Sequence, residues 1–283
     1  MSDTVPARMD GDERAAALNA NIAAYDSVDD KAYVNGAPHL KHASIATIYK
    51  SIVDSAIARV GRDSRTISVL ELGAGNGLAS IPWFERQVRM TAVDSSESML
   101  RGLGRRAAPY GLSPVTVTSD AVEFLNSTDE SFDVITHVSM IHHVPDYQRL
   151  LSLSAARVSA GGCLITFQDP LRYDHMPSGH HLIERASYFA WRAGQGNVKR
   201  GLKTRWRRLR GVYSPTEVVD FEDYHVVRSG VDSAQIVRLL KASFAEVDVI
   251  PYWSTYSRRL QALGERFHVF SSFGILASGR TSS

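Results

Sequence analysis

The chain has 283 residues, of which 44% are hydrophobic and 22% are charged. A chain of this length can bury a sizeable core, and it contains no apolar run of about 20 residues that would indicate a membrane span. Its single cysteine, Cys163, excludes an internal disulfide framework and a multi-cysteine metal site. The net charge of +2 argues against nucleic acid as a partner. We therefore expect a cytoplasmic protein that binds neither a membrane nor nucleic acid.

The N-terminal segment, residues 1–60, is expected to form a loose tail followed by a helical lid. Its first fifteen residues include four acidic ones and no apolar stretch, which is not the pattern of a secretory signal. A turn is predicted at 35–38, where Asn, Gly, Ala and Pro follow one another. Beyond it, apolar residues fall at helical spacing on one face: Ile45, Ile48, Ile52, Ala56 and Val60.

Apolar strand-like runs then alternate with helical stretches. The runs lie at 67–72, 90–93, 115–118, 132–138 and 163–167. Strands separated by helices of about 10 to 15 residues indicate βαβ units and a mostly parallel sheet. Residues 61–170 are therefore predicted to form a doubly wound α/β core.

The alternation stops after Pro170 and resumes near Val231. A helix at 233–240 and two strands at 246–251 and 267–277 are predicted there, which makes 231–283 the C-terminal part of the core. The segment between, 171–230, is rich in His, Arg and aromatic residues and is too long for a plain connection. We expect it to be a helical insertion that caps the acceptor site.

A glycine-rich loop follows the first predicted strand. It contains Gly73, Gly75 and Gly77, which let a backbone turn sharply and approach a ligand closely. A dinucleotide fingerprint would place a small residue three positions after Gly75, where this chain has Leu78. Glu71, two residues before the first glycine, would repel a pyrophosphate. The loop therefore favours a cofactor with a positive end, such as S-adenosylmethionine.

Polar residues also follow the next three predicted strands. Asp94 ends the second strand, where its carboxylate could accept both ribose hydroxyls. Ser119, Asp120 and Ala121 follow the third and suit an adenine amino group, and His142 comes shortly after the fourth.

Five successive motifs resemble those of the class I S-adenosylmethionine-dependent methyltransferases. They are ELGAGNG, AVDSSESML, SDA, FDVITHVSMIHHVPD and SAGGCLITFQDP, and they cover residues 67–170. The resemblance implies a Rossmann-like sheet of seven strands, the last one antiparallel, and an enzyme that transfers a methyl group to the O, N or C atom of a small molecule. The function expected from it belongs to specialised metabolism or cofactor biosynthesis.

The resemblance also implies roles for individual residues. Glu71 and the glycine loop would hold the methionyl end of the cofactor, Asp94 the ribose, and Asp120 the adenine. The complete expected cofactor set is Glu71, Gly73, Ala74, Gly75, Asp94, Ser95, Met99, Asp120, Ala121, His137 and Val138. Purely structural roles stay open for the three acids, as a strand-end residue for Glu71 and as helix caps for Asp94 and Asp120.

Histidines and one tyrosine are the candidate catalytic residues. Histidine is the natural general base near neutral pH, and the resemblance places His143 and His142 at the start of a helix near the transferable methyl group. We favour His143 over His142, with Tyr25 on a lid and His39 as an acceptor contact. A second group, formed by His175, His180 and His181, has no recognised metal-ligand spacing, so no metal site is expected.

Other functions remain open in the sequence. Residues 199–210 hold seven basic residues and no acid, so the acceptor could be anionic or bound to a carrier protein, and an oligomer of this chain could form there. The basic stretch could also serve a protein or RNA methyltransferase. A protein that uses the sulfonium for a non-methylating reaction such as a cyclisation is a further alternative, whereas Glu71 and Leu78 disfavour a nicotinamide oxidoreductase.

Overall fold

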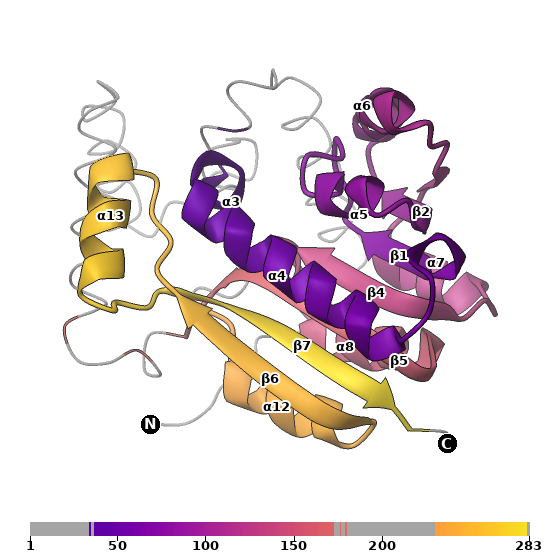
Figure 1. Cartoon of the computed structure of the whole chain (residues 1–283). Coiled ribbons are helices and arrows are strands. Elements are labelled where there is room, and N and C mark those ends of the chain that lie inside the picture. Colours follow the sequence, from indigo (N-terminus) through magenta and orange to yellow (C-terminus); the bar gives the residue numbers. More distant parts are fainter. Residues whose placement is uncertain (1–33, 35–36, 173–175, 177–178, 180–229, 282–283) are drawn as a thin grey trace, which may run out of the picture.

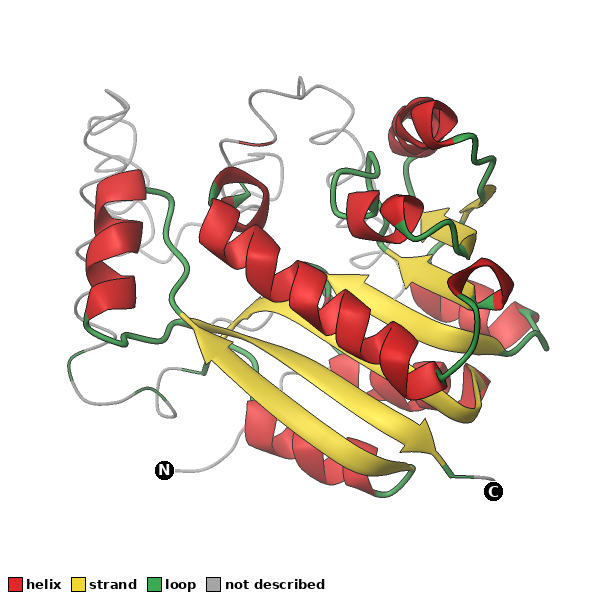
Figure 2. Cartoon of the chain, viewed as in Figure 1, coloured by secondary structure: helices red, strands yellow, loops and turns green. Residues whose placement is uncertain are grey.

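A computed structural model describes residues 34, 37–172, 176, 179 and 230–281. Tyr25, most of the predicted insertion and the basic stretch lie outside the described residues. The described part contains one seven-stranded sheet in the order β3-β2-β1-β4-β5-β7-β6 (Figures 1 and 2). Its strands are β1 (Ser68–Leu72), β2 (Arg89–Asp94), β3 (Val115–Thr118), β4 (Phe132–Val138), β5 (Val158–Pro170), β6 (Phe244–Tyr252) and β7 (Ser272–Arg280).

All neighbouring strands pair in parallel except where β7 is involved, because β7 runs antiparallel to both β5 and β6. The central strand β4 is buried along its whole length, as expected for a parallel strand with helices on both faces. The predicted doubly wound α/β sheet with an antiparallel last strand is confirmed.

Two layers of helices cover the sheet. The longer helices are α4 (Ala43–Val60), α6 (Glu97–Ala107), α8 (Tyr147–Arg157), α12 (Ser233–Lys241) and α13 (Arg258–Arg266), and the shorter ones are α3 (Pro38–Lys41), α5 (Ile81–Glu85), α7 (Ala121–Ser127), η1 (Ser64–Thr66), η2 (Ala108–Tyr110) and η3 (Ile141–His143). Figure 1 shows α4 in front of the sheet and α8 and α12 behind it. Side chains of α4, α5 and α6 share one apolar cluster and those of α7, α8 and α12 the other. We call these two sides of the sheet the α4 face and the α8 face.

Three local predictions differ from the structure. β5 extends well beyond the predicted 163–167, since it pairs with β4 from Val158 and with β7 up to Pro170. The predicted strand at 267–277 begins only at Ser272, because α13 occupies 258–266 and Phe267 is 67% exposed. His142 and His143 lie in the short 3₁₀ helix η3 and not at the start of a longer helix, since α8 begins only at Tyr147 behind an Asp146 cap. In each case pairing or capping elsewhere in the fold decides the boundary.

None of the described helices is long and apolar enough to cross a lipid bilayer.

Candidate functional site

The glycine loop lies at the carboxyl end of β1 and is tied to β2. The N–H groups of Gly73 and Ala74 donate to the Val93 carbonyl at 2.9 and 3.1 Å. Gly73 has a φ of +69°, and a Cβ there would lie 2.9 Å from the Met140 side chain. Gly77 has a φ of +81°, and a Cβ there would lie 2.9 Å from the Cα of Leu103 on α6. The last glycine is thus required for packing of α6, and the first for the close approach of the residues after β4.

Asp94 connects the loops that follow β1, β2 and β3. Its Oδ2 accepts a hydrogen bond from the Gly75 N–H at 2.8 Å, and its Oδ1 accepts one from the Ser96 N–H at 2.9 Å. Its carbonyl accepts from the Ser119 N–H at 3.0 Å. The N-cap of α6 is Ser96, whose hydroxyl accepts from the Met99 N–H. Asp94 is therefore not the helix cap, and it lies half-buried between the glycine loop and Ser95.

Asp120, after β3, does cap a helix. Its Oδ1 accepts from the N–H groups of Val122 and Glu123 at 2.9 and 3.1 Å, at the start of α7. Ala121, the first residue of α7, is 8% exposed, and Met99 on α6 is 7% exposed. Asp120 thus has the structural role of a helix cap that the sequence left open.

Glu71 is a buried acid beneath the glycine loop. It is 1% exposed, and its Oε2 accepts a hydrogen bond from the Ser80 hydroxyl at 2.5 Å. Burial raises the pKa of its carboxyl to about 8, the Ser80 hydrogen bond opposes this, and the charge of Asp94 adds to it. Burial raises the pKa of the Tyr49 hydroxyl, and the nearby charge of Glu71 adds to that shift. A carboxyl in these surroundings gains strongly from a cation placed next to it.

His137 and Val138, the last two residues of β4, point to opposite faces of the sheet. Val138 belongs to the apolar cluster of the α4 face, and successive strand residues alternate, so His137 lies on the α8 face. His137 is fully buried, neither of its ring nitrogens has a hydrogen-bond partner within the described ranges, and burial lowers its pKa to about 3. It is therefore a neutral imidazole.

The carboxyl ends of β4 and β5 bring His142 and Asp169 together. The His142 Nδ1 lies 2.7 Å from the Asp169 Oδ1, which also accepts the His142 backbone N–H at 3.2 Å. Asp169 is fully buried, and its Oδ2 has no partner among the described residues. Burial raises the pKa of Asp169 well above its usual range, and hydrogen bonds from the backbone N–H groups of His142 and Ile141 oppose the shift. The His142 Nδ1 and the Asp169 Oδ1 share one proton, and its position follows the tautomer of the imidazole.

Two further histidines surround this pair. The His143 ring centroid lies 4.1 Å from that of His142, and His143 itself is half-buried. His39, on α3, is 7% exposed, and its Nδ1 has no hydrogen-bond partner among the residues that the structure describes. Burial lowers the pKa of His39 to about 3, and the nearby His142 adds to that shift.

Helix α3 is fastened to the segment between β6 and α13, which fixes the place of His39. The Lys41 ammonium donates to the Tyr256 carbonyl at 2.7 Å, and the His42 Nε2 donates to the Thr255 carbonyl at 2.6 Å. The expected acceptor contact His39 and the expected base His142 are thus neighbours, although they are about 100 residues apart in the sequence.

Sequence reasoning did not select Asp169 as a site residue. Its signal was present, because an acid directly after a buried strand lies at the carboxyl edge, the edge at which His142 was already expected. Tyr25, His175, His180 and His181 lie outside the described residues. Within the described ranges, no group of three His, Cys, Asp or Glu side chains could hold a metal ion.

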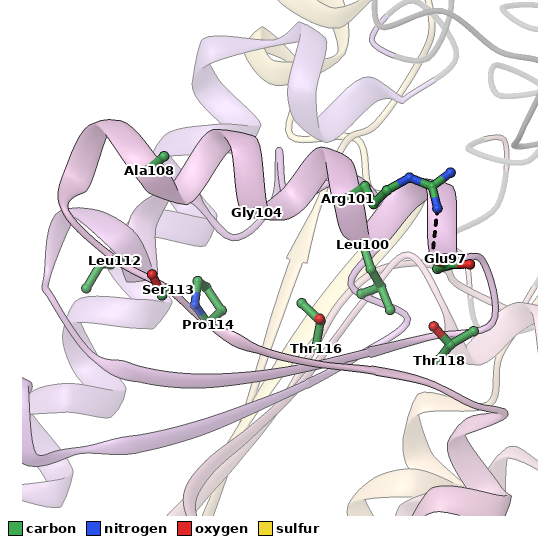
Figure 3. A pocket seen from close by; sticks show the side chains of 10 residues that line it. All are labelled: Glu97, Leu100, Arg101, Gly104, Ala108, Leu112, Ser113, Pro114, Thr116 and Thr118. Carbon is green, nitrogen blue, oxygen red and sulfur yellow. Dashed lines mark ion pairs between the residues drawn. The ribbon is translucent and has the colours of Figure 1, made fainter.

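A shallow groove of about 380 Å³ lies between α6 and β3, at the outer side of the sheet (Figure 3). Leu100 and Thr116 face each other across it, and the Glu97–Arg101 ion pair stands at one end. That end, formed by Glu97 and Thr118, adjoins in sequence the residues expected to hold ribose and adenine. The groove is thus beside the expected cofactor site and not at the His142–Asp169 pair.

Comparisons with known proteins agree with the motifs. Residues 69–162 match a family model described as a methyltransferase domain. The chain is 33% identical over 96 residues to a ubiquinone biosynthesis O-methyltransferase of Coxiella burnetii, which is 34% of this chain and 41% of that protein. It is 32% identical over 120 residues to the enzyme of the same name from a Caulobacter species, which is 40% and 48% of the two chains. The chain thus matches less than half the length of these curated relatives.

Solved structures share the fold over most of the chain. N-methyltransferase NodS from Bradyrhizobium japonicum, in complex with S-adenosyl-L-homocysteine, aligns with a TM-score of 0.54 at 12% identity over 94% of this chain and 99% of that one. A putative sarcosine dimethylglycine methyltransferase from Galdieria sulphuraria aligns with a TM-score of 0.52 at 14% identity, over 84% and 87% of the two chains. Residues 69–162 therefore form a methyltransferase domain, and the chain has the class I methyltransferase fold that its motifs resemble.

Proposed function

We propose that this chain is an S-adenosylmethionine-dependent methyltransferase that methylates a hydroxyl oxygen of a small molecule, with His142 as the general base. The methyltransferase domain supports the reaction class, and the names of the curated relatives support an oxygen acceptor. The observation that carries the choice of oxygen is the contact between His142 and the buried Asp169. A hydroxyl has to lose a proton on methylation, and this pair provides a place for that proton.

The residues at the carboxyl ends of β1, β2 and β3 fit the proposed cofactor. Glu71 is a buried carboxyl with no basic side chain among the contacts described for it, so a cofactor ammonium group would stabilise its ionised form. Asp94 holds the Gly75 and Ser96 N–H groups, and a carboxylate at the end of the second strand is suited to accept ribose hydroxyls. When bound there, S-adenosylmethionine supplies an electrophilic methyl group.

His142 is suited to remove the acceptor proton. In the proposed mechanism Nδ1 of the neutral imidazole directs its hydrogen at Asp169, and Nε2 accepts the proton of the acceptor. The imidazolium that forms lies beside the Asp169 carboxyl, which accepts its Nδ1–H and fixes the ring orientation. The neutral His39 nearby can hydrogen-bond the acceptor without repelling a cationic cofactor. Alignment of the acceptor with the methyl group supplies much of the remaining rate acceleration.

The proposal is tested by incubating the full chain with methyl-labelled S-adenosylmethionine and a panel of diphenols, sugar alcohols, carboxylated phenols and primary amines. S-adenosylhomocysteine and labelled product are measured together by mass spectrometry. We expect label on a hydroxyl oxygen, with one equivalent of S-adenosylhomocysteine formed. Label on nitrogen alone would overturn the choice of oxygen, and product without S-adenosylhomocysteine would favour a non-methylating reaction.

A further inference from the structure

Strand β5 contains one extra residue just before Asp169. Its ladder with β7 pairs Phe167 with Gly274 and then Asp169 with Phe273, so Gln168 has no partner in the register. Gln168 has a φ of +66°, the left-handed region that residues other than glycine seldom adopt. An unpaired residue in this conformation is a β-bulge.

The bulge changes the face of the sheet to which Asp169 points. Phe167 belongs to the apolar cluster of the α4 face. In a regular strand, residues two apart share a face, so Asp169 would also point to the α4 face. Its partner in the actual register is Phe273, which lies in the cluster of the α8 face. Gln168 thus shifts Asp169 onto the α8 face, next to η3 and His142.

Side-chain contacts hold the bulge in place. The Gln168 amide donates from Nε2 to the Ser254 hydroxyl at 2.8 Å and accepts at Oε1 from the Tyr252 hydroxyl at 3.2 Å. Gln168 is 8% exposed, so these bonds are shielded from water. The Tyr252 ring also stacks on Phe167, with ring centroids 5.0 Å apart. Tyr252 therefore contacts both Gln168 and the residue that precedes it in β5.

A second left-handed residue follows the end of β4. Ser139 has a φ of +54°, and its N–H donates to the Phe167 carbonyl at 2.7 Å. This turn leads the chain from β4 into η3, which contains His142. Two left-handed residues, one within β5 and one just after β4, therefore precede the two members of the pair. Such outliers persist only where the surrounding structure enforces them, and they gather at functional sites.

We propose that Gln168 is a positioning residue, whose left-handed bulge, anchored by Tyr252 and Ser254, aims the Asp169 carboxylate at His142. The inference rests on the proposed function only for its catalytic consequence, because the aim of Asp169 can be measured without turnover.

The test compares two replacements of Gln168. Valine, which is β-branched, cannot adopt the left-handed conformation without large strain, whereas asparagine tolerates it. The ring ¹⁵N shifts of His142, assigned through a His142→Asn variant, report which nitrogen carries the proton. We expect the unaltered chain and Gln168→Asn to hold it on Nδ1, and Gln168→Val to lose that preference. Once an acceptor is known, Gln168→Val should lower kcat by about 10-fold or more with KM for the cofactor unchanged.

If Gln168→Val does not fold, Tyr252→Phe combined with Ser254→Ala removes both anchors while keeping the stacked ring. This double variant should weaken the Nδ1 preference of His142. Unchanged His142 shifts in a folded Gln168→Val, or in the double variant when valine does not fold, would overturn the inference. Changed shifts together with no methyl transfer by the unaltered chain would uphold the positioning role and contradict the proposed function.

Discussion

The two halves of the carboxyl edge are built differently. At the β1, β2 and β3 half, the left-handed positions are the glycines of the loop, and the acids Asp94 and Asp120 are bonded to backbone N–H groups. At the β4 and β5 half, the left-handed positions are Ser139 and Gln168. The second half also has the buried polar atoms that lack partners in the described part of the chain, on His39, His137, Thr166 and Asp169.

We expect the first half of the edge to bind the cofactor and the second half to carry out the chemistry. Glycine adopts the left-handed conformation without strain, so the first half forms a preorganised cradle at little cost in stability. Strained residues and unsatisfied polar atoms in the second half lower stability, and they are expected where a site must present reactive groups. We therefore expect mutations in the two halves to act on different steps.

The largest effect is expected for His142→Ala. Removal of a general base lowers kcat by about 10² to 10⁴-fold. The affinity for S-adenosylhomocysteine, measured by calorimetry, should change by less than about 3-fold, because the glycine loop and Asp94 are untouched. His143→Ala is the matched control, and it should keep kcat within about 5-fold. If both variants lost kcat equally, the two histidines would have to share the role of base.

Asp94→Ala should affect cofactor binding at the β1, β2 and β3 half of the carboxyl edge. It removes the acceptor for the Gly75 and Ser96 N–H groups as well as the expected ribose contact, so cofactor affinity should fall by about 10 to 100-fold. Asp94→Asn keeps an amide oxygen for one of these bonds and should lose less. Calorimetric titration with S-adenosylhomocysteine measures both, and circular dichroism shows that the fold is retained. Undiminished affinity in Asp94→Ala would rule out the ribose assignment.

Glu71→Gln should produce a smaller effect that depends on pH. The raised pKa of about 8 means that the folded chain keeps this carboxyl protonated while the unfolded chain ionises it, between its ordinary pKa of 4.5 and 8. The cost to stability therefore grows as pH rises through that window and is absent below it. Removing the charge should stabilise the fold by about 4 kcal/mol at pH 7.5 and by little at pH 4.5.

Urea unfolding at the two pH values checks this, with the exposed Glu130→Gln as the control that should show no such dependence. The same Glu71→Gln substitution should weaken cofactor binding by about 10-fold, because it removes the partner of the ammonium group. If Glu71→Gln raised the stability but left the affinity for the cofactor unchanged, Glu71 would have only a structural role.

Much of the cofactor half could be predicted from the sequence. Strand ends, glycines and acids follow one another within short segments there, so spacing alone places Glu71, Gly73 and Asp94 at one edge of a parallel sheet. Local rules did not reveal that Gly77 lets α6 pack closely against the glycine loop at Leu103. That role depends on a contact between elements.

The other half depends on long-range register. Asp169 faces His142 only because β5 contains a bulge, and the bulge is defined by pairing with β7, more than 100 residues later in the chain. The periodicity of apolar residues in the sequence does not reveal a single unpaired residue within a strand. The choice between His143 and His142 also depends on this register, since two adjacent histidines cannot be distinguished until the partner strand is placed.

The most direct test of the central claim is a crystal structure of the full chain with S-adenosylhomocysteine bound. We predict that the cofactor sulfur atom faces the His142 Nε2 at a distance of about 5–7 Å, with room between them for one acceptor oxygen in line with the sulfur. We also predict that the ribose contacts Asp94. A sulfur atom separated from His142 by other side chains, or a ribose that does not touch Asp94, would contradict it.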